Sequence, residues 1–262
     1  MRSIILCIVS IFICFGCEEV KKLIDDNLTE GEVGDGLKEA LTIGCEVASG
    51  SASKTDGFLM NELIRIALPP EALTVKNAVD NVNSPIVTGF LTALGFDFNA
   101  KLDELHVAMN RAAEESAKTA FNIFAGAVTN MTITDAFGIL RADTDTAAMH
   151  YMRVNTTQPL TSSFSPIVQQ AINTVGVLSY WAPIVNSYNS INSQIDSYNN
   201  TMAGMLLPVP RLGNDVNPDL ESYIVGKSIN GLMLLIGEQE KKIRNDPVAQ
   251  VTDLLRKVFG NK

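Results

Sequence analysis

Apolar residues recur along most of the chain at intervals of three and four, the spacing that places side chains on one face of an α-helix. The clearest stretch follows Asp97, where apolar residues from Phe98 to Val128 trace one face and most charged residues fall elsewhere. This stretch predicts a helix of about thirty residues at the centre of the fold. No segment alternates strictly between apolar and polar residues for long enough to require a β-strand. The pattern therefore predicts an all-α protein.

Prolines and capping residues mark the ends of further helices. A helix is predicted from near Gly36, and Leu68-Pro69-Pro70 interrupts the helical pattern downstream, because proline lacks the N–H that a helix interior needs. Ser84-Pro85, Asn217-Pro218 and Asp246-Pro247 each place a capping residue before a proline, which is typical of a helix start.

One polar stretch interrupts this pattern in the second half of the chain. Residues 189–203 are rich in Asn, Ser and Tyr, and Leu206-Leu207-Pro208-Val209-Pro210 follows them. We expect a surface excursion here rather than a linker between domains. No repeat of fixed period is present, so the sequence predicts a single multi-helix domain over residues 33–262.

The first residues have the pattern of a signal peptide that ends at a cysteine. Arg2 precedes an apolar run over residues 4–13, which is shorter than the roughly 20 residues that span a bilayer. The run leads to Gly16-Cys17, which resembles the bacterial lipobox, although Cys14 stands where Leu is usual. We predict a lipoprotein signal peptide over 1–16, lipidation of Cys17 and a lipidated tether over 17–32. A plain cleaved signal peptide and an uncleaved anchor helix remain the alternatives.

The charge of the chain bears on what can hold it at a membrane. The net charge is −9, which repels the phosphates of nucleic acids and of anionic lipids, so we expect no nucleic-acid partner. Acyl chains on Cys17 would supply the membrane anchor instead. We therefore predict a protein of the bacterial cell envelope, lipid-anchored at the outer membrane on its periplasmic or its surface face.

Cysteine and histidine usage gives little sign of chemistry. After loss of the signal peptide and acylation of Cys17, only Cys45 remains free, and its helical surroundings favour a buried small residue over a nucleophile. His106 and His150 have no cysteine or carboxylate at ligand spacing. The sequence also contains no phosphate-binding loop and no Gly-x-Ser-x-Gly motif. We predict no metal site, no cofactor and no catalytic set.

Charged residues near predicted turns and helix starts are the candidates for a binding site. They fall in a turn at 53–57, on the long helix, and at the starts of the next two helices. Turn chemistry, helix caps and ion pairs between helices are the structural alternative to a polar cleft that binds an anionic group. The candidate residues are Lys54, Asp56, Arg111, Glu114, Asp135, Asp145, Tyr151 and Arg153.

A charged run near the C-terminus has a simpler interpretation. Glu238 with Lys242, and Glu240 with Arg244, are spaced four residues apart, as in the ion pairs of a solvated helix face. A partner-binding surface is the alternative.

Several segments taken together resemble a known family. They are Gly36-Leu37-Lys38-Glu39-Ala40-Leu41, Ser53-Lys54-Thr55-Asp56-Gly57-Phe58-Leu59, Met109-Asn110-Arg111-Ala112-Ala113-Glu114, Met131-Thr132-Ile133-Thr134-Asp135-Ala136, Asp145-Thr146-Ala147-Ala148, Glu240-Lys241-Lys242-Ile243-Arg244 and Thr252-Asp253-Leu254-Leu255-Arg256-Lys257-Val258-Phe259-Gly260. In this order they resemble the bacterial family of unknown function DUF4197, over nearly the whole mature chain. The resemblance implies an α-helical periplasmic or surface protein and carries over no catalytic residue. The stretch at 189–203 looks like an insertion beyond the family's pattern.

These observations leave two classes of function. The first is a non-enzymatic envelope lipoprotein whose helical domain binds an envelope protein or a small hydrophobic ligand, or has a structural role. The second is an enzyme of unfamiliar type, hydrolase-like, with a polar cleft. A deep apolar pocket would favour a ligand, an exposed apolar patch would favour a protein partner, and a concave site with perturbed carboxylates would favour an enzyme.

Overall fold

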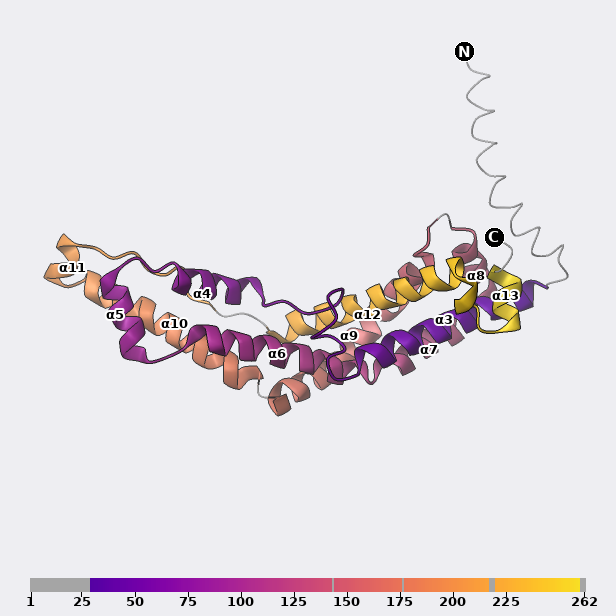
Figure 1. Cartoon of the computed structure of the whole chain (residues 1–262), viewed down its shortest axis with the longest axis horizontal. Coiled ribbons are helices and arrows are strands. Elements are labelled where there is room, and N and C mark those ends of the chain that lie inside the picture. The colour runs from indigo at the N-terminus through magenta and orange to yellow at the C-terminus, as the bar shows by residue number, and fades with distance from the viewer. Residues whose placement is uncertain (1–28, 143, 176, 217–219, 260–262) are drawn as a thin grey trace, which may run out of the picture. The chain divides into compact units, whose positions relative to one another are not determined.

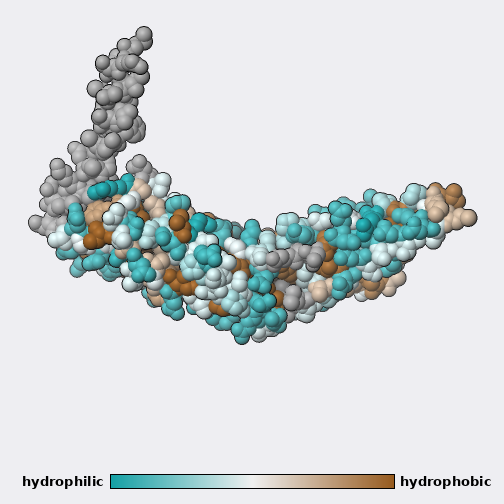
Figure 2. All heavy atoms as spheres, turned by 180° about the vertical axis from the view of Figure 1, so that it is seen from behind, coloured by the Kyte–Doolittle hydropathy of each residue, from teal (hydrophilic) through white to brown (hydrophobic). Residues whose placement is uncertain are grey.

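The computed structural model describes residues 29–142, 144–175, 177–216 and 220–259. In these ranges the chain forms the α-helices α3 to α13 and one 3₁₀ turn, and it contains no β-strand, which confirms the all-α prediction (Figure 1). On the face seen in Figure 2, hydrophilic surface predominates and hydrophobic surface is scattered in patches. The signal peptide, Cys17 and residues 17–28 of the predicted tether lie outside the described residues.

The described residues form two compact units. Of the described residues, unit 1 takes those up to Lys54, those within Ala117–Ser162 and those from Ile229 onward, and unit 2 takes those within Thr55–Ser116 and Ser163–Ser228. Each unit is described by itself below. The single domain over residues 33–262 stays a prediction.

Unit 1 is built on α3 (Glu30–Ala52), which packs against the three short helices α7 (Ala120–Thr129), α8 (Ile133–Leu140) and α13 (Asp253–Phe259). The unit also includes the first part of α9 (Ala147–Val175) and the second part of α12 (Leu220–Asn245). The core side of α3 is the one that the spacing predicts, and these side chains are buried: Leu37, Leu41, Cys45 and Ala48.

Helix α3 begins at Glu30, six residues before the predicted start near Gly36. Thr29 and Glu32 form a capping box, in which the Thr29 hydroxyl accepts from the N–H of Glu32 at 3.2 Å and Glu32 accepts from the N–H of Thr29 at 2.7 Å. The last residues of the predicted tether are therefore the first turn of a helix. Gly36 lies inside it, where a Cβ would approach Val258 of α13 to 2.7 Å, so only glycine permits this close packing.

Unit 2 contains α4 (Pro70–Asp80), α5 (Pro85–Leu94), α6 (Phe98–Ala117), α10 (Val177–Asn199) and α11 (Met202–Leu206). The second part of α9 and the start of α12 complete it. Helix α10 packs against both α5 and α11. Proline occupies the first turn of α4 and of α5, and Ser84-Pro85 starts α5 as the sequence predicts.

The predicted long central helix is wrong, because the stretch forms two helices. Helix α6 ends at Ala117 and α7 begins at Ala120, with a turn at Lys118 and Thr119. No glycine or proline marks the break and the apolar spacing continues across it, so the pattern alone does not reveal the end of the helix. The predicted last helix is divided in a similar way, into the 3₁₀ turn η1 (Pro247–Ala249) and α13.

The surface excursion predicted for residues 189–203 is also wrong. Most of the stretch continues α10 to Asn199, and α11 follows after two residues. The helix has a buried side whose spacing is masked by the Asn and Ser residues between its members. These buried residues are Ile184, Tyr188, Ile191 and Ile195.

Among the described helices, none is individually long and apolar enough to cross a membrane. The short helices α7 and α8 reach that standard only when taken together, and the chain bends by 103° between them.

Candidate functional site

Three of the eight predicted site residues meet in unit 2, around the buried carboxylate of Glu114. Glu114 lies on α6 with 5% of its surface exposed. Its Oε1 accepts from the backbone N–H groups of Phe58 at 3.2 Å and Leu59 at 3.3 Å, and its Oε2 accepts from Arg111 Nη1 at 2.7 Å. Arg111 Nη2 also donates to Asp56 Oδ1 at 2.7 Å. The cluster therefore fastens the turn at 56–59 to α6.

The charged residues of this cluster form ion pairs with one another. Hydrogen bonding to Glu114, and then to Asp56, raises the pKa of the Arg111 guanidinium. Asp56 has a φ of 66°, a left-handed conformation that aspartate adopts more readily than most residues. The ion pair with Arg111 holds the side chain of this strained residue in place. This arrangement matches the structural alternative, in which turn chemistry and ion pairs explain the charged residues.

The remaining predicted residues lie in unit 1 and are not gathered at one point. Asp135 closes a capping box at the start of α8, where Thr132 donates to it from its N–H at 3.0 Å and from its hydroxyl at 2.7 Å. These bonds lower the pKa of Asp135. Burial and then the charge of Asp135 raise the pKa of Tyr151. Arg153 instead donates to Asn230 Oδ1 at 3.1 Å.

The two other candidates in unit 1 are exposed. Lys54 and Asp145 both lie at the surface. The function of the eight residues as a polar cleft stays a prediction, because the contacts found around Asp56, Arg111, Glu114 and Asp135 are those of turns and caps.

Unit 1 contains a buried ion pair that the sequence pattern misses. Glu240 and Arg244 of α12 are 7% and 5% exposed, so the predicted solvated face is wrong for this pair. Glu240 accepts from the N–H groups of Ala148 and Met149, both at 3.0 Å, in the first turn of α9. Arg244 donates to Glu240 at 2.9 Å and to the carbonyl of Ile139, in the last turn of α8, at 3.2 Å. The pair thus satisfies two helix ends with charges of the favourable sign.

A sequence signal for this burial does exist. Ile236 and Ile243, which are both buried, lie on the same side of α12 as Glu240, at helical spacing. The side chain of Glu238 is exposed, as the sequence predicts. Its partner differs from the prediction, because Glu238 pairs with Lys241 at 3.0 Å rather than with Lys242.

A small cavity adjoins Glu240 and Arg244 in unit 1. Its volume is about 20 Å³, enough for one water molecule and not for an organic ligand. Its lining is mostly apolar and consists of Leu37, Ala40, Leu41, Gly44, Ala148, Ile236, Glu240, Ile243, Arg244 and Phe259.

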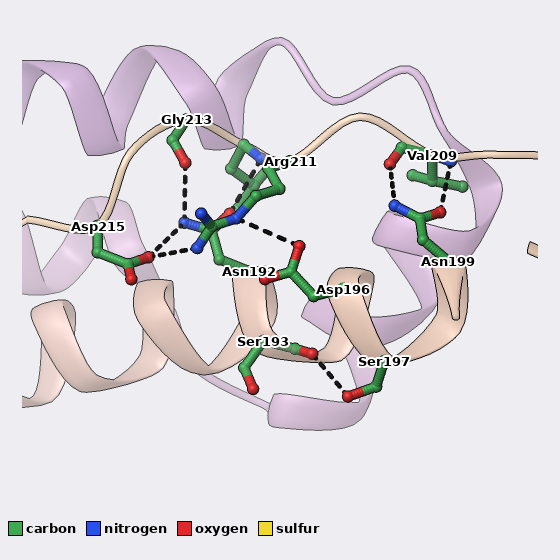
Figure 3. Close-up of polar contacts among 10 residues, drawn as sticks. Asn192, Ser193, Asp196, Ser197, Asn199, Val209, Arg211, Gly213 and Asp215 are labelled. Atoms are coloured by element: carbon green, nitrogen blue, oxygen red, sulfur yellow. Dashed lines mark hydrogen bonds and ion pairs between the residues drawn. The ribbon is translucent and has the colours of Figure 1, made fainter. Parts of the chain in front are cut away.

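In unit 2, asparagine side chains of α10 bind a return segment, which we define as residues 207–216 (Figure 3). Asn199 donates to the carbonyl of Val209 at 2.8 Å and accepts from its N–H at 2.9 Å. Asn192, which is fully buried, accepts from the N–H of Leu212 at 3.1 Å and donates to the carbonyl of Gly213 at 3.1 Å. Each amide side chain therefore replaces the backbone partners that a neighbouring strand would provide.

The same device recurs at two further asparagines of unit 2. Asn189 donates to the carbonyl of Val216 at 3.3 Å and accepts from its N–H at 3.2 Å. On α6, the buried Asn110 pairs with both the N–H and the carbonyl of Ile66, at 2.9 Å each. The Asn-rich composition, which suggested a surface excursion, thus reflects the fixing of extended backbone to helices.

Arg211 is the cation of the return segment. It pairs with Asp215 at 2.7 Å and with Asp196 of α10 at 3.5 Å (Figure 3). Nearby, Gly213 has a φ of 154°, and a Cβ at this position would come within 2.8 Å of the hydroxyl of Tyr188. Glycine therefore lets the return segment pass closely over α10.

A groove of about 460 Å³ lies within unit 2, between residues 78–87 and residues 210–212. Its lining combines small polar and aliphatic side chains, and its one charged residue, Arg211, is paired with acidic neighbours. Such a surface suits an uncharged partner of mixed polarity. The lining residues are Ala78, Asn81, Val82, Asn83, Ser84, Val87, Pro210, Arg211 and Leu212.

Cys45 occupies a structural position. Cys45 is fully buried in α3, as predicted, and burial raises the pKa of its thiol to about 12, so the reactive thiolate is strongly disfavoured. Within the described ranges, no group of three or more His, Cys, Asp and Glu side chains is arranged to hold a metal ion.

Comparison with known families identifies one match. A family described as "Protein of unknown function (DUF4197)" matches residues 27–260, nearly the whole chain and including the stretch at 189–203. No curated protein and no solved structure matches the chain. This match confirms the resemblance seen in the sequence, and the chain belongs to the DUF4197 family.

Proposed function

We propose that this chain is a non-enzymatic lipoprotein of the bacterial cell envelope, anchored by acyl chains on Cys17, whose unit 2 groove binds an uncharged segment of an envelope protein. The observation that carries the binding role is the groove of about 460 Å³ beside the return segment. Its volume lies in the range of small-molecule sites, which is room for a few side chains of a protein segment.

The construction of the groove supports binding without large rearrangement. Asn192 and Asn199 fix the return segment by two-way hydrogen bonds to its backbone. A wall that is already ordered does not have to be ordered again on binding, which favours affinity. The amides of Asn81 and Asn83 and the hydroxyl of Ser84 offer hydrogen bonds to a partner.

The charged residues support a structural role rather than catalysis. Glu114 and Glu240 each accept from two backbone N–H groups and from an arginine, so their carboxylates hold distant segments together. The cavity in unit 1 holds about one water molecule, so it gives a small hydrophobic ligand no room. The amides and hydroxyl in the lining of the unit 2 groove support an uncharged protein segment there rather than a small hydrophobic ligand.

The anchor is tested by metabolic labelling with an alkyne-bearing fatty acid. We expect wild-type protein to take up the label, whereas Cys17→Ser does not. Cys45→Ser is the matched control and should keep the label. Equal labelling of wild type and Cys17→Ser would contradict the lipoprotein proposal.

The groove is tested by photo-crosslinking in living cells. A photoreactive amino acid at Asn83, an exposed residue of the groove, is expected to give a discrete crosslinked protein band. The same amino acid at Thr74, an exposed position of α4 that is not among the groove residues, is the control. Identical crosslinks from the two positions, or none from Asn83, would count against the groove.

A further inference from the structure

Four large apolar side chains project into solvent at the tip of unit 2. Met202, Met205, Leu206 and Leu207 are 83%, 71%, 78% and 72% exposed, and we call them the apolar knob. They belong to α11 and the residue after it. Hydrophobic surface gathers at this tip in Figure 2, at the right-hand end of the view, and it protrudes rather than lining a hollow.

The chain segment that carries the apolar knob contains no charged residue. No Asp, Glu, Lys, Arg or His occurs from Ser197 to Pro210, although the whole chain has a net charge of −9. Tyr198 and Asn199, at the base of the knob, are partly exposed. When the knob enters an apolar phase, no ionised group of this segment has to lose its hydration. Such a loss would otherwise be the largest free-energy cost of entry.

Part of the backbone of the knob is hydrogen-bonded internally. Met205 donates its N–H to the carbonyl of Thr201 at 2.9 Å, and Gly204 donates to the Thr201 hydroxyl at 3.1 Å. Leu207 donates to the carbonyl of Ala203 at 2.9 Å, and Pro208, the next residue, has no N–H. Each of these bonds favours entry into lipid, because the hydrocarbon offers no partner for a free N–H.

The knob also rests on a fixed support. Gly204 is buried, and a Cβ there would collide with the carbonyl oxygen of Tyr198 at the end of α10, so α11 packs tightly on that helix. Asn199 holds Val209 on the other side of the knob. The apolar side chains are therefore exposed by a well-packed structure and not by a loose end of the chain.

We propose that the apolar knob inserts into the interfacial region of a lipid bilayer. A convex cluster of apolar side chains without charge matches the boundary between headgroups and acyl chains, where the apolar area is removed from water. The insertion uses neither anionic lipid nor basic residues, so it persists at high salt. It depends only on residues of unit 2 and does not rest on acylation of Cys17.

The test uses intact protein purified from its own envelope and added to vesicles of phosphatidylcholine with brominated acyl chains. Leu206→Trp places a fluorescent reporter in the knob, whereas the native Trp181 is 4% exposed and gives a constant background. Met60→Trp is the control, because Met60 is another exposed apolar residue of unit 2, at 72%. We expect a blue shift and bromine quenching for Leu206→Trp, unchanged at high salt, and neither for Met60→Trp.

A second variant confirms that the knob drives the insertion. Met202→Ser, Met205→Ser and Leu207→Ser, combined with Leu206→Trp, should abolish the quenching. The thermal midpoint should stay unchanged, because all four positions are exposed. The mass of the same purified protein reports the acylation of Cys17 separately, so failure of the anchor and failure of the knob are distinguishable.

Three results would overturn the proposal. The first is fluorescence of the Leu206→Trp variant that bromine does not quench, and the second is equal quenching in the Met60→Trp variant. The third is a blue shift that appears without vesicles and is lost on dilution, which would assign the knob to a second copy of the chain.

Discussion

At the scale of single residues, Glu114 is expected to be critical for unit 2. Glu114→Ala leaves two N–H groups and Arg111 without their partner, and we expect it to lower the free energy of unfolding by about 3–5 kcal/mol. Glu114→Gln keeps one acceptor and should cost about 1–3 kcal/mol. Urea unfolding measures both. Glu104→Gln on the same helix removes an exposed ion pair and should cost about 0–1 kcal/mol.

The raised pKa of Cys45 predicts how the free energy of unfolding changes at alkaline pH. Burial raises the thiol pKa from 9.0 to about 12 in the folded protein, so the unfolded chain loses this proton first. The contribution of Cys45 is therefore fully present below pH 9 and is lost as the pH rises toward about 12, with a limiting slope of about 1.4 kcal/mol per pH unit.

The measurement is the unfolding free energy against pH for the wild type and for Cys45→Ala. We expect the wild type to fall more steeply above pH 9, because tyrosines and lysines titrate equally in both proteins. Parallel curves would show that the thiol is ionised as readily when folded as when unfolded.

At the scale of helices, Glu240 joins α12 to the start of α9. Glu240→Ala and Arg244→Ala should each destabilise unit 1 by about 3–5 kcal/mol, because each leaves the opposite charge buried without its partner. The two effects should not add, since each mutation breaks the same ion pair. A double-mutant cycle measures the coupling, and the exposed pair Glu238–Lys241 is the control. Strict additivity would contradict a shared buried pair.

Removal of an asparagine of α10 is expected to loosen the return segment locally. Asn192→Ala removes the partners of Leu212 and Gly213, so hydrogen exchange at the amide of Leu212 should accelerate more than exchange in the core of α10. Asn200→Ala, at an exposed position just after α10, is the control. Unchanged exchange at Leu212 would mean that the return segment is held by other contacts.

These helices also show what a sequence can reveal. The prolines of α4 and α5 and the Thr132–Asp135 cap of α8 are local signals, and each lies where the chain starts a helix. The burial of Glu240 and of Asn192 depends instead on backbone groups far away in the chain. A polar side chain that will be satisfied by a distant carbonyl or N–H has the same local pattern as one in water.

The candidate site, like the helices, was predictable only where its contacts are local in the sequence. The three-residue spacing of Arg111 and Glu114 indicates that they share a side of one helix. Only the tertiary structure brings the turn at 56–59 to them, through hydrogen bonds to residues more than fifty positions away in the chain. No sequence pattern indicates the groove in unit 2, because the groove depends on the path of the return segment.

At the scale of the whole molecule, the open question is whether the two compact units unfold together. Helices α9 and α12 each contribute residues to both units without a break in the helix. A helix is cooperative along its length, since each added hydrogen bond depends on the turn before it. Disruption of either unit should therefore fray these helices into the other, and we expect one unfolding transition for the chain.

Glu240→Ala and Trp181 together provide the test. The substitution lies in unit 1 and the fluorescent residue in unit 2. If unfolding is cooperative, Glu240→Ala lowers the midpoint of Trp181 fluorescence by as much as the midpoint of the helical circular dichroism signal, and the calorimetric and van't Hoff enthalpies agree. If Trp181 keeps its wild-type midpoint while part of the helical signal is lost earlier, the units are separate folding domains. In that case the continuity of α9 and α12 does not couple them, and a partner bound at the groove of unit 2 would stabilise that unit alone.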